Sequence, residues 1–129
     1  MNLDISLAEA LLSTASVAAG AFAGGLVRGL LSKLRGRYTG TACSNMLACF
    51  ALGIMLARVD LGALVHLPYW EVAFGTGFCG ALSTLATLAR ELGNLTYERA
   101  WIRLSLYTVF TVLGGLGTVW LGWLLGMAV

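Results

Sequence analysis

The sequence predicts an all-α integral membrane protein with four transmembrane helices in a single domain, residues 1–129. Of its residues, 59% are hydrophobic and only 11% are charged, a balance far outside that of soluble proteins. The charged residues are segregated, which leaves uncharged stretches near the roughly 20 residues that cross a bilayer as a helix. Because spanning strands alternate apolar and polar residues and these stretches do not, we expect helices. The expected spans are residues 10–27, 38–57, 72–89 and 104–129.

The first span is expected to remain in the mature protein. Asp4 and Glu9 precede it where a cleaved signal peptide carries Lys or Arg. Gly20 and Gly24 are one helical turn apart and provide a smooth face on which another helix can approach closely. Arg28 ends the span, where an arginine either draws anions into a vestibule or extends to the membrane interface.

In the second span, the notable residue is Asn45, an amide in the middle of an apolar stretch. An amide buried at that depth needs a hydrogen-bond partner or a permeating ligand, and its NH₂ group can donate to an anion. A hydrogen bond between helices accounts for it equally well, and the residue type does not separate the two interpretations.

Small and hydroxyl residues are concentrated in the third span, within residues 75–91, where a plain spanning helix would carry Leu and Val. We expect a helix break near its middle. Non-helical backbone at membrane depth persists only where it is buried in protein or lines a polar site, so freed carbonyls would suit a cation and freed N–H groups an anion. The alternative is an unbroken packing helix whose hydroxyls bond to their own carbonyls.

Hydroxyl groups and small residues also mark the fourth span. Tyr107 and Thr111 are spaced i, i+4, so they share a face and form either a hydroxyl track or a packing surface. Gly122 and Gly126 repeat the one-turn glycine spacing of the first span. Four helices of this length barely enclose a solvated path, so a transport function would require association of subunits.

Neither an enzyme nor a nucleic-acid-binding protein is indicated. No set of residues resembles a nucleophile with its base and orienting group. A net charge of +2 is too small for nucleic-acid binding. The three cysteines, Cys43, Cys49 and Cys79, lie within apolar spans without metal-ligand spacing, so we interpret them as small buried thiols.

The basic residues predict the orientation in the membrane. Only Arg58 lies on one side, whereas the other seven flank the first and third connections. By the positive-inside rule, those two connections face the cytoplasm and both termini lie outside. The seven are Arg28, Lys33, Arg35, Arg37, Arg90, Arg99 and Arg103.

Three separated blocks, in their order and spacing, resemble the Fluc (CrcB) family of fluoride channels. With the four spans they cover essentially the whole chain. The blocks are Gly20-Ala-Phe-Ala-Gly-Gly-Leu-Val-Arg28, then Gly40-Thr41 through Asn45 to Phe50 and Gly53, then Gly77-Phe-Cys-Gly-Ala-Leu-Ser-Thr-Leu-Ala-Thr-Leu-Ala-Arg-Glu91.

The resemblance implies an antiparallel dimer with two narrow pores along the subunit interface, passing fluoride passively out of the cell through the inner or plasma membrane. It also implies a structural sodium ion, not transported, held by backbone carbonyls of Gly80 and Ser83 at the break in the third helix. Arg28 matches the vestibule arginine and Asn45 the pore asparagine, while Thr87 with Thr111 matches a hydroxyl track. The implied pore-lining residues are Asn45, Thr84, Leu85, Thr87, Leu88, Tyr107 and Thr111.

Departures from the family pattern are concentrated near the expected pore. Leu85 and Leu88 replace two phenylalanines whose positive ring edges face fluoride in the family. Ala86 replaces a serine, and Ala48 and Cys49 replace a glycine and a serine. An aliphatic side chain has no comparable positive edge, so the contribution of this subunit to anion coordination is weakened.

Those losses and the basic asymmetry together predict a heterodimer. An antiparallel homodimer needs one chain to insert both ways, which a seven-to-one bias opposes. A homologous partner, inserted oppositely, would then carry the phenylalanines. Two alternatives remain: a non-conducting structural subunit, and a small multidrug transporter, whose proton coupling needs a carboxylate within the membrane. For the transporter we regard Glu9 as the only candidate, too near the start of the first span.

Overall fold

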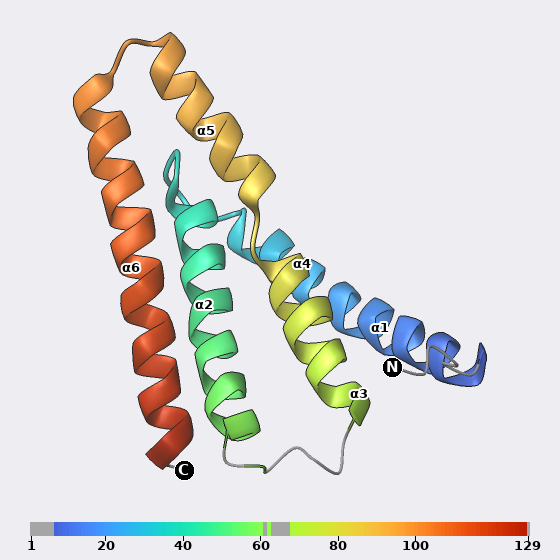
Figure 1. Cartoon of the computed structure of the whole chain (residues 1–129). Helices are drawn as coiled ribbons and strands as arrows, with labels where there is room; N and C mark the ends of the chain where they lie inside the picture. Colours follow the sequence, from blue (N-terminus) through green and yellow to red (C-terminus); the bar gives the residue numbers. More distant parts are fainter. Residues whose placement is uncertain (1–6, 61, 63–67, 129) are drawn as a thin grey trace.

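The computed structural model describes residues 7–60, 62 and 68–128, and regular secondary structure within them is entirely helical. Four stretches are long and apolar enough to cross a membrane: Leu7–Leu31, Thr39–Asp60, Tyr69–Tyr97 and Trp101–Ala128. They overlap all four predicted spans; Val129 lies outside the described residues. The elements in order are α1 (Leu7–Leu31), α2 (Thr39–Asp60), α3 (Pro68–Glu71), η1 (Val72–Cys79), α4 (Gly80–Leu82), α5 (Leu85–Tyr97) and α6 (Trp101–Ala128) (Figure 1).

The third span is not a continuous α-helix. It opens with one turn of α-helix, continues as the π-helix η1 and returns to α-helix in α4. The helix then stops at Ser83 (φ −70°, ψ 153°) and Thr84 (φ −145°, ψ 95°), whose backbone is extended. The predicted break near the middle of this span is therefore confirmed, and Figure 1 shows α5 leaving α4 in a new direction.

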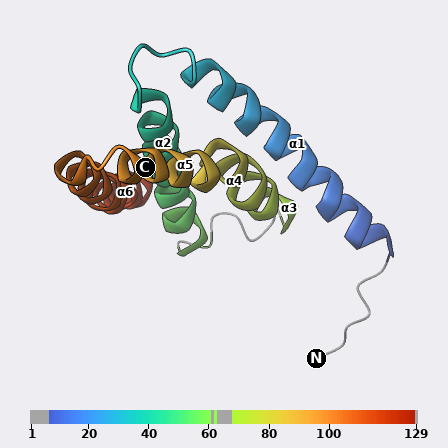
Figure 2. The same cartoon turned by 90° about the horizontal axis from the view of Figure 1, so that it is seen from above.

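The helices form two closely packed pairs. One pair is α2 with α6, which lie side by side along most of their length (Figure 1). In the other pair, α1 packs against the segment formed by η1 and α4 and passes behind it at an angle in Figure 1; seen from above, α1 runs beside that segment (Figure 2). The segment α5 extends beyond α4 to a short turn that joins it to α6.

Glycines allow both pairs to approach at backbone distance. In the first pair, a Cβ atom added at Gly53 would collide with the carbonyl oxygen of Val119, and one at Gly122 with that of Phe50. In the second pair, a Cβ at Gly24 would collide with the carbonyl oxygen of Phe78. A Cβ at Gly20 would collide with the carbonyl oxygen of Ala73, and one at Gly77, on the facing helix, with that of Val17. Both predicted glycine pairs are thus packing features, because Gly126 likewise contacts α2.

Replacing one of these glycines should destabilise the pair it belongs to. We expect Gly122→Ala to lower the free energy of unfolding by about 1–3 kcal/mol, the usual cost of overpacking, since the added Cβ would meet backbone atoms of Phe50 rather than a flexible side chain. Gly117→Ala on the same helix is the matched control, because nothing lies within 4 Å of a Cβ there. Thermal unfolding in detergent measures both; equal midpoints for the two variants would contradict the packing.

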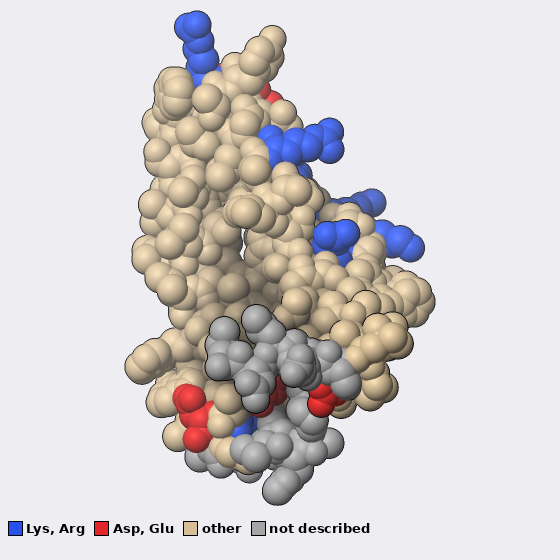
Figure 3. Space-filling view, turned by 45° about the vertical axis from the view of Figure 1, so that its right-hand side comes forward, with Lys and Arg blue, Asp and Glu red and all other residues tan. Residues whose placement is uncertain are grey.

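The two ends of the molecule differ in charge (Figure 3). Lysine and arginine side chains gather at and beside the end where α1 meets α2 and α5 meets α6, whereas acidic side chains predominate at the other. Arg37 and Glu98 form an ion pair that joins these two connections. The hydrogen bond from Arg37 holds the pKa of the Glu98 carboxyl below its ordinary range. At the opposite end, Trp123 Nε1 donates to Asp60 Oδ2 at 3.3 Å, which fastens α6 to α2.

Candidate functional site

The break in the third span is held by Asn45 of α2. The backbone N–H of Thr84 donates to Asn45 Oδ1 at 2.7 Å, so the amide oxygen satisfies a donor that the interrupted helix leaves without its usual partner. Because a backbone N–H can bond only to an acceptor, the side-chain oxygen of Asn45, and not its nitrogen, must point toward the break. The Nδ2 group of Asn45 is then the part of the side chain available to donate to a ligand.

Thr84 starts α5 by capping it. Its hydroxyl oxygen accepts from the backbone N–H of Thr87 at 3.2 Å, the usual arrangement at a helix N-terminus. Thr84 Oγ1 in turn donates to Thr87 Oγ1 at 2.8 Å. Because the hydroxyl oxygen of Thr87 accepts that bond, its own hydroxyl proton is free to point elsewhere.

The bonds to Asn45 Oδ1 and Thr84 Oγ1 leave two backbone carbonyl groups without their usual helical donors. In a continuous helix the carbonyl of Gly80 would accept from the N–H of Thr84, and that of Ser83 from the N–H of Thr87. Both N–H groups are bonded to side-chain oxygens instead. The carbonyl of Gly80 accepts only a long bond from the Ser83 hydroxyl, at 3.3 Å.

The released carbonyls belong to the two residues predicted to hold sodium. A hard cation prefers neutral oxygen ligands of this kind, so the donor set at the break fits a sodium ion. The described residues contain no group of three or more His, Cys, Asp or Glu side chains that could hold a metal. The sodium assignment itself stays a prediction.

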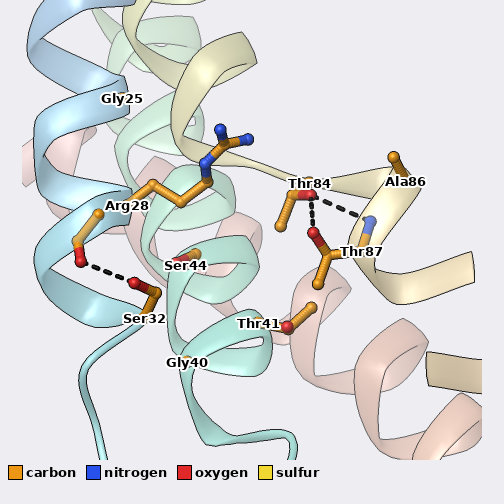
Figure 4. Close-up of a pocket in the computed structure, with 10 residues that line it drawn as sticks. Gly25, Arg28, Ser32, Gly40, Thr41, Ser44, Thr84, Ala86 and Thr87 are labelled. Atoms are coloured by element: carbon orange, nitrogen blue, oxygen red, sulfur yellow. Dashed lines mark hydrogen bonds between the residues drawn. The ribbon is translucent and has the colours of Figure 1, made fainter. Parts of the chain in front are cut away.

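A polar cavity of about 510 Å³ opens beside the break, between α1, α2 and the start of α5 (Figure 4). Arg28 reaches across it from α1 toward Thr84, and Thr87 faces it from α5 (Figure 4). Its wall on α2 includes Thr41 and Ser44, both buried. The guanidinium of Arg28 and the free hydroxyl proton of Thr87 give this cavity donors for an anion.

A second cavity of about 250 Å³ lies between α2, α5 and α6. Asn45 and Ser83 supply polar groups to it, and Thr111 contributes from α6. The rest of its wall is largely apolar, and both Leu85 and Leu88 belong to it. The hydrogen bond between Asn45 and Thr84 therefore connects a residue of this cavity with a residue of the Arg28 cavity.

Glu91 of α5 links three helices near the first cavity. Its carboxylate accepts from Thr41 Oγ1 of α2 and from Tyr107 OH of α6, both at 2.7 Å. The ring of Tyr107 packs on that of Tyr38, with centroids 4.9 Å apart. Each oxygen of the carboxylate has one hydroxyl donor, so Glu91 fixes the direction of α5 relative to α2 and α6.

The predicted pore residues other than Tyr107 divide between the two cavities, and Tyr107 lines neither of them. Arg28, Thr84 and Thr87 line the first cavity, while Asn45 and Thr111 line the second with Leu85 and Leu88. Thr87 and Thr111, matched to one hydroxyl track, thus line different cavities within this subunit. Thr111 donates to the carbonyl of Tyr107 at 2.8 Å, and Tyr107 itself is bonded to Glu91.

Sequence reasoning missed the role of Glu91. Glu9 is the only candidate carboxylate named from the sequence for proton coupling; Glu91 also belongs to a stretch long and apolar enough to cross a membrane, Tyr69–Tyr97. One signal in the sequence pointed to this role. The hydroxyl residues Thr41 and Tyr107 lie near the starts of the second and fourth spans, on the same side of the membrane as Glu91 near the end of the third.

Comparison with known proteins supports one family. Residues 15–123 match the family described as CrcB-like protein, Camphor Resistance (CrcB). The chain is 50% identical over 100 residues to fluoride-specific ion channel FluC 2 of Corynebacterium diphtheriae, covering 77% of this chain and 86% of that protein. It is 37% identical over 125 residues to fluoride-specific ion channel FluC of Thermococcus kodakarensis, covering 97% and 98%. FluC 2 of Moorella thermoacetica is 38% identical over 116 residues, covering 84% and 91%.

Proposed function

Because the chain belongs to the CrcB family, whose relatives described above are named fluoride-specific ion channels, we propose that it is a subunit of a passive fluoride channel. Its four apolar helices make it a multi-pass membrane protein. The channel releases fluoride from the cytoplasm across the cell membrane and lowers the intracellular concentration. The single observation that carries the proposal is Asn45, which lines the second cavity and whose oxygen is bonded at the helix break, so that its Nδ2 group is left to donate.

Fluoride is small and strongly hydrated, so a pathway for it must replace water with hydrogen-bond donors. Arg28 and Thr87 offer donors in the first cavity, and Asn45 Nδ2 offers one in the second. Thr111 directs its proton to the carbonyl of Tyr107, so it serves an anion only after its hydroxyl rotates. The hydrogen-bond donors that this subunit offers to an anion therefore lie along the helix break, from Arg28 and Thr87 in the first cavity to Asn45 in the second.

Sodium bound to the carbonyls of Gly80 and Ser83 would supply a fixed positive charge beside the anion path. The chain's own residues prepare the site, because Asn45 and Thr84 take the N–H groups that would otherwise occupy those carbonyls. Since the ligands are backbone oxygens, Ser83 does not need a particular side chain. Such an ion would be structural and would not be transported.

We further propose that the functional channel is an antiparallel heterodimer. Leu85 and Leu88 line the cavity that contains Asn45, and neither offers the positive ring edge of a phenylalanine to an anion. Leu85 is also 79% exposed in the single subunit, a position suited to contact with a second chain. The seven-to-one distribution of basic residues favours one orientation, with both termini outside. Several relatives carry numbered names such as FluC 1 and FluC 2, a numbering that fits paired chains.

Fluoride efflux from sodium-loaded liposomes tests the proposal. We expect little efflux from this chain alone and rapid efflux when a homologous, oppositely inserted subunit is added, because each pore then receives the partner's phenylalanines. Introducing Leu85→Phe and Leu88→Phe together should raise the efflux of the pair. Rapid efflux from the chain alone would overturn the heterodimer. Efflux from the partner alone, unchanged by this chain, would assign it the structural role without conduction.

Arg28 should control how fast fluoride enters the first cavity. We expect Arg28→Gln to lower efflux of the pair several-fold at low ionic strength and less at high salt, because screening weakens the attraction of an exposed charge for anions. Arg58→Gln is the matched control, because Arg58 lies in the last turn of α2, at the end away from the Arg28 cavity. The measurement is efflux at two salt concentrations; an equal loss for both variants would contradict a vestibule role for Arg28.

A further inference from the structure

Two cysteines from different helices line one cavity. Cys49 on α2 and Cys79 at the end of η1 both line a space of about 220 Å³ beside Gly80 and Ser83. Cys79 is 4% exposed and Cys49 is half-buried, and both are free thiols. The third cysteine, Cys43, lines none of the three cavities described in this structure.

Cys49 also lines the neighbouring cavity that contains Asn45 and Thr111. Its thiol thus stands at the boundary between the thiol-lined space and the candidate anion path. Met46, one turn away on α2, adds a thioether to the wall of the second cavity. Sulfur ligands are therefore concentrated in this part of the molecule, although no carboxylate or imidazole lines either cavity.

We propose that Cys49 and Cys79 form a two-thiolate site for a soft, thiophilic metal ion of the mercuric, silver or cuprous type. Thiolates select soft metals over hard ones, and closed-shell ions of this class accept two sulfur ligands in a line. With metal–sulfur bonds of about 2.3 Å, such a unit spans about 4.6 Å, a length that a cavity of this size admits. A protein site for zinc usually has three or four such ligands, and the described residues contain no group of three or more His, Cys, Asp or Glu side chains.

Binding involves no oxidation or reduction. Each thiol loses its proton to water as its sulfur–metal bond forms. One mercuric ion replaces two protons and leaves the bridged pair neutral, whereas one silver or cuprous ion leaves it with a single negative charge. The metal–thiolate bridge joins α2 to η1 beside Gly80 and Ser83, next to the helix break. Because Cys49 also faces the Asn45 cavity, an occupied site narrows the anion path; this consequence for conduction rests on the proposed function, whereas metal binding does not.

Titration of the purified chain in detergent with mercuric chloride, followed by the ultraviolet absorbance of mercury–thiolate bonds, tests the site. We expect one tightly held mercuric ion per chain in competition with a soluble monothiol. Cys49→Ser or Cys79→Ser should each weaken binding by roughly 100-fold or more, because a second linked ligand raises avidity by that order. Cys43→Ser, the matched control, should retain it. Equal affinity in all three variants would overturn the proposal.

Two further measurements keep the result interpretable. Thermal unfolding of each variant shows whether it is folded, and Cys79→Ala replaces Cys79→Ser if the hydroxyl is not tolerated in that buried position. In liposomes that show efflux, mercuric ion should block conduction, with much less block when the chain carries Cys49→Ser. Tight binding with unchanged efflux would overturn the placement of the site beside the anion path. A chain that binds mercury but never supports efflux would refute the proposed function and leave the metal site established.

Discussion

Asn45→Asp should abolish most fluoride efflux while leaving the subunit folded. Aspartate has nearly the same shape, and its carboxylate oxygen still accepts the N–H of Thr84 at the helix break. The substitution removes the Nδ2 donor and places a negative charge in the Asn45 cavity, which repels fluoride. We expect efflux of the heterodimer to fall by roughly 100-fold or more, since loss of a donor and repulsion act together.

The control for this experiment is Asn94→Asp, the same change at an exposed position of α5. It should leave efflux unchanged. Asn45→Ala adds a second test, because it leaves the N–H of Thr84 without an acceptor and should lower the free energy of unfolding by about 1–3 kcal/mol. Full efflux from Asn45→Asp would show that this side chain serves only to hold the break.

Glu91→Leu should both destabilise the subunit and reduce efflux. The change deprives the hydroxyls of Thr41 and Tyr107 of their acceptor and releases the ties from α5 to α2 and α6. Each orphaned hydroxyl costs about 1–3 kcal/mol, so the unfolding free energy should fall by more than either hydroxyl deletion alone. Because α5 carries Thr87 and Leu88, its displacement also disturbs both cavities.

Thr41→Val and Tyr107→Phe separate the two ties. Each removes one donor and leaves the carboxylate with the other, so each should cost less than Glu91→Leu. Unfolding midpoints and efflux rates are compared for all three variants. If Glu91→Leu unfolds at the same midpoint as the native chain, the carboxylate does not hold α5 in place.

The spans and their helical conformation follow from the sequence, because the membrane sets the same requirements for each segment separately. A lipid-exposed backbone must satisfy its own hydrogen bonds over a fixed length, so the four apolar runs predict the four spans. The break was predictable for the same local reason, since the third span is rich in small and hydroxyl residues. The glycine pairs at Gly20/Gly24 and Gly122/Gly126 likewise mark close packing wherever their partner lies.

The sequence by itself therefore determined the number of spans, the position of the break and the family that the motifs resemble. Only the tertiary structure decided which groups meet: the N–H of Thr84 with the oxygen of Asn45, Glu91 with Thr41 and Tyr107, and Cys49 with the cavity of Cys79. Helical periodicity tells which side chains share a face of one helix. It does not tell which helix that face meets, because that depends on how separate helices cross in space.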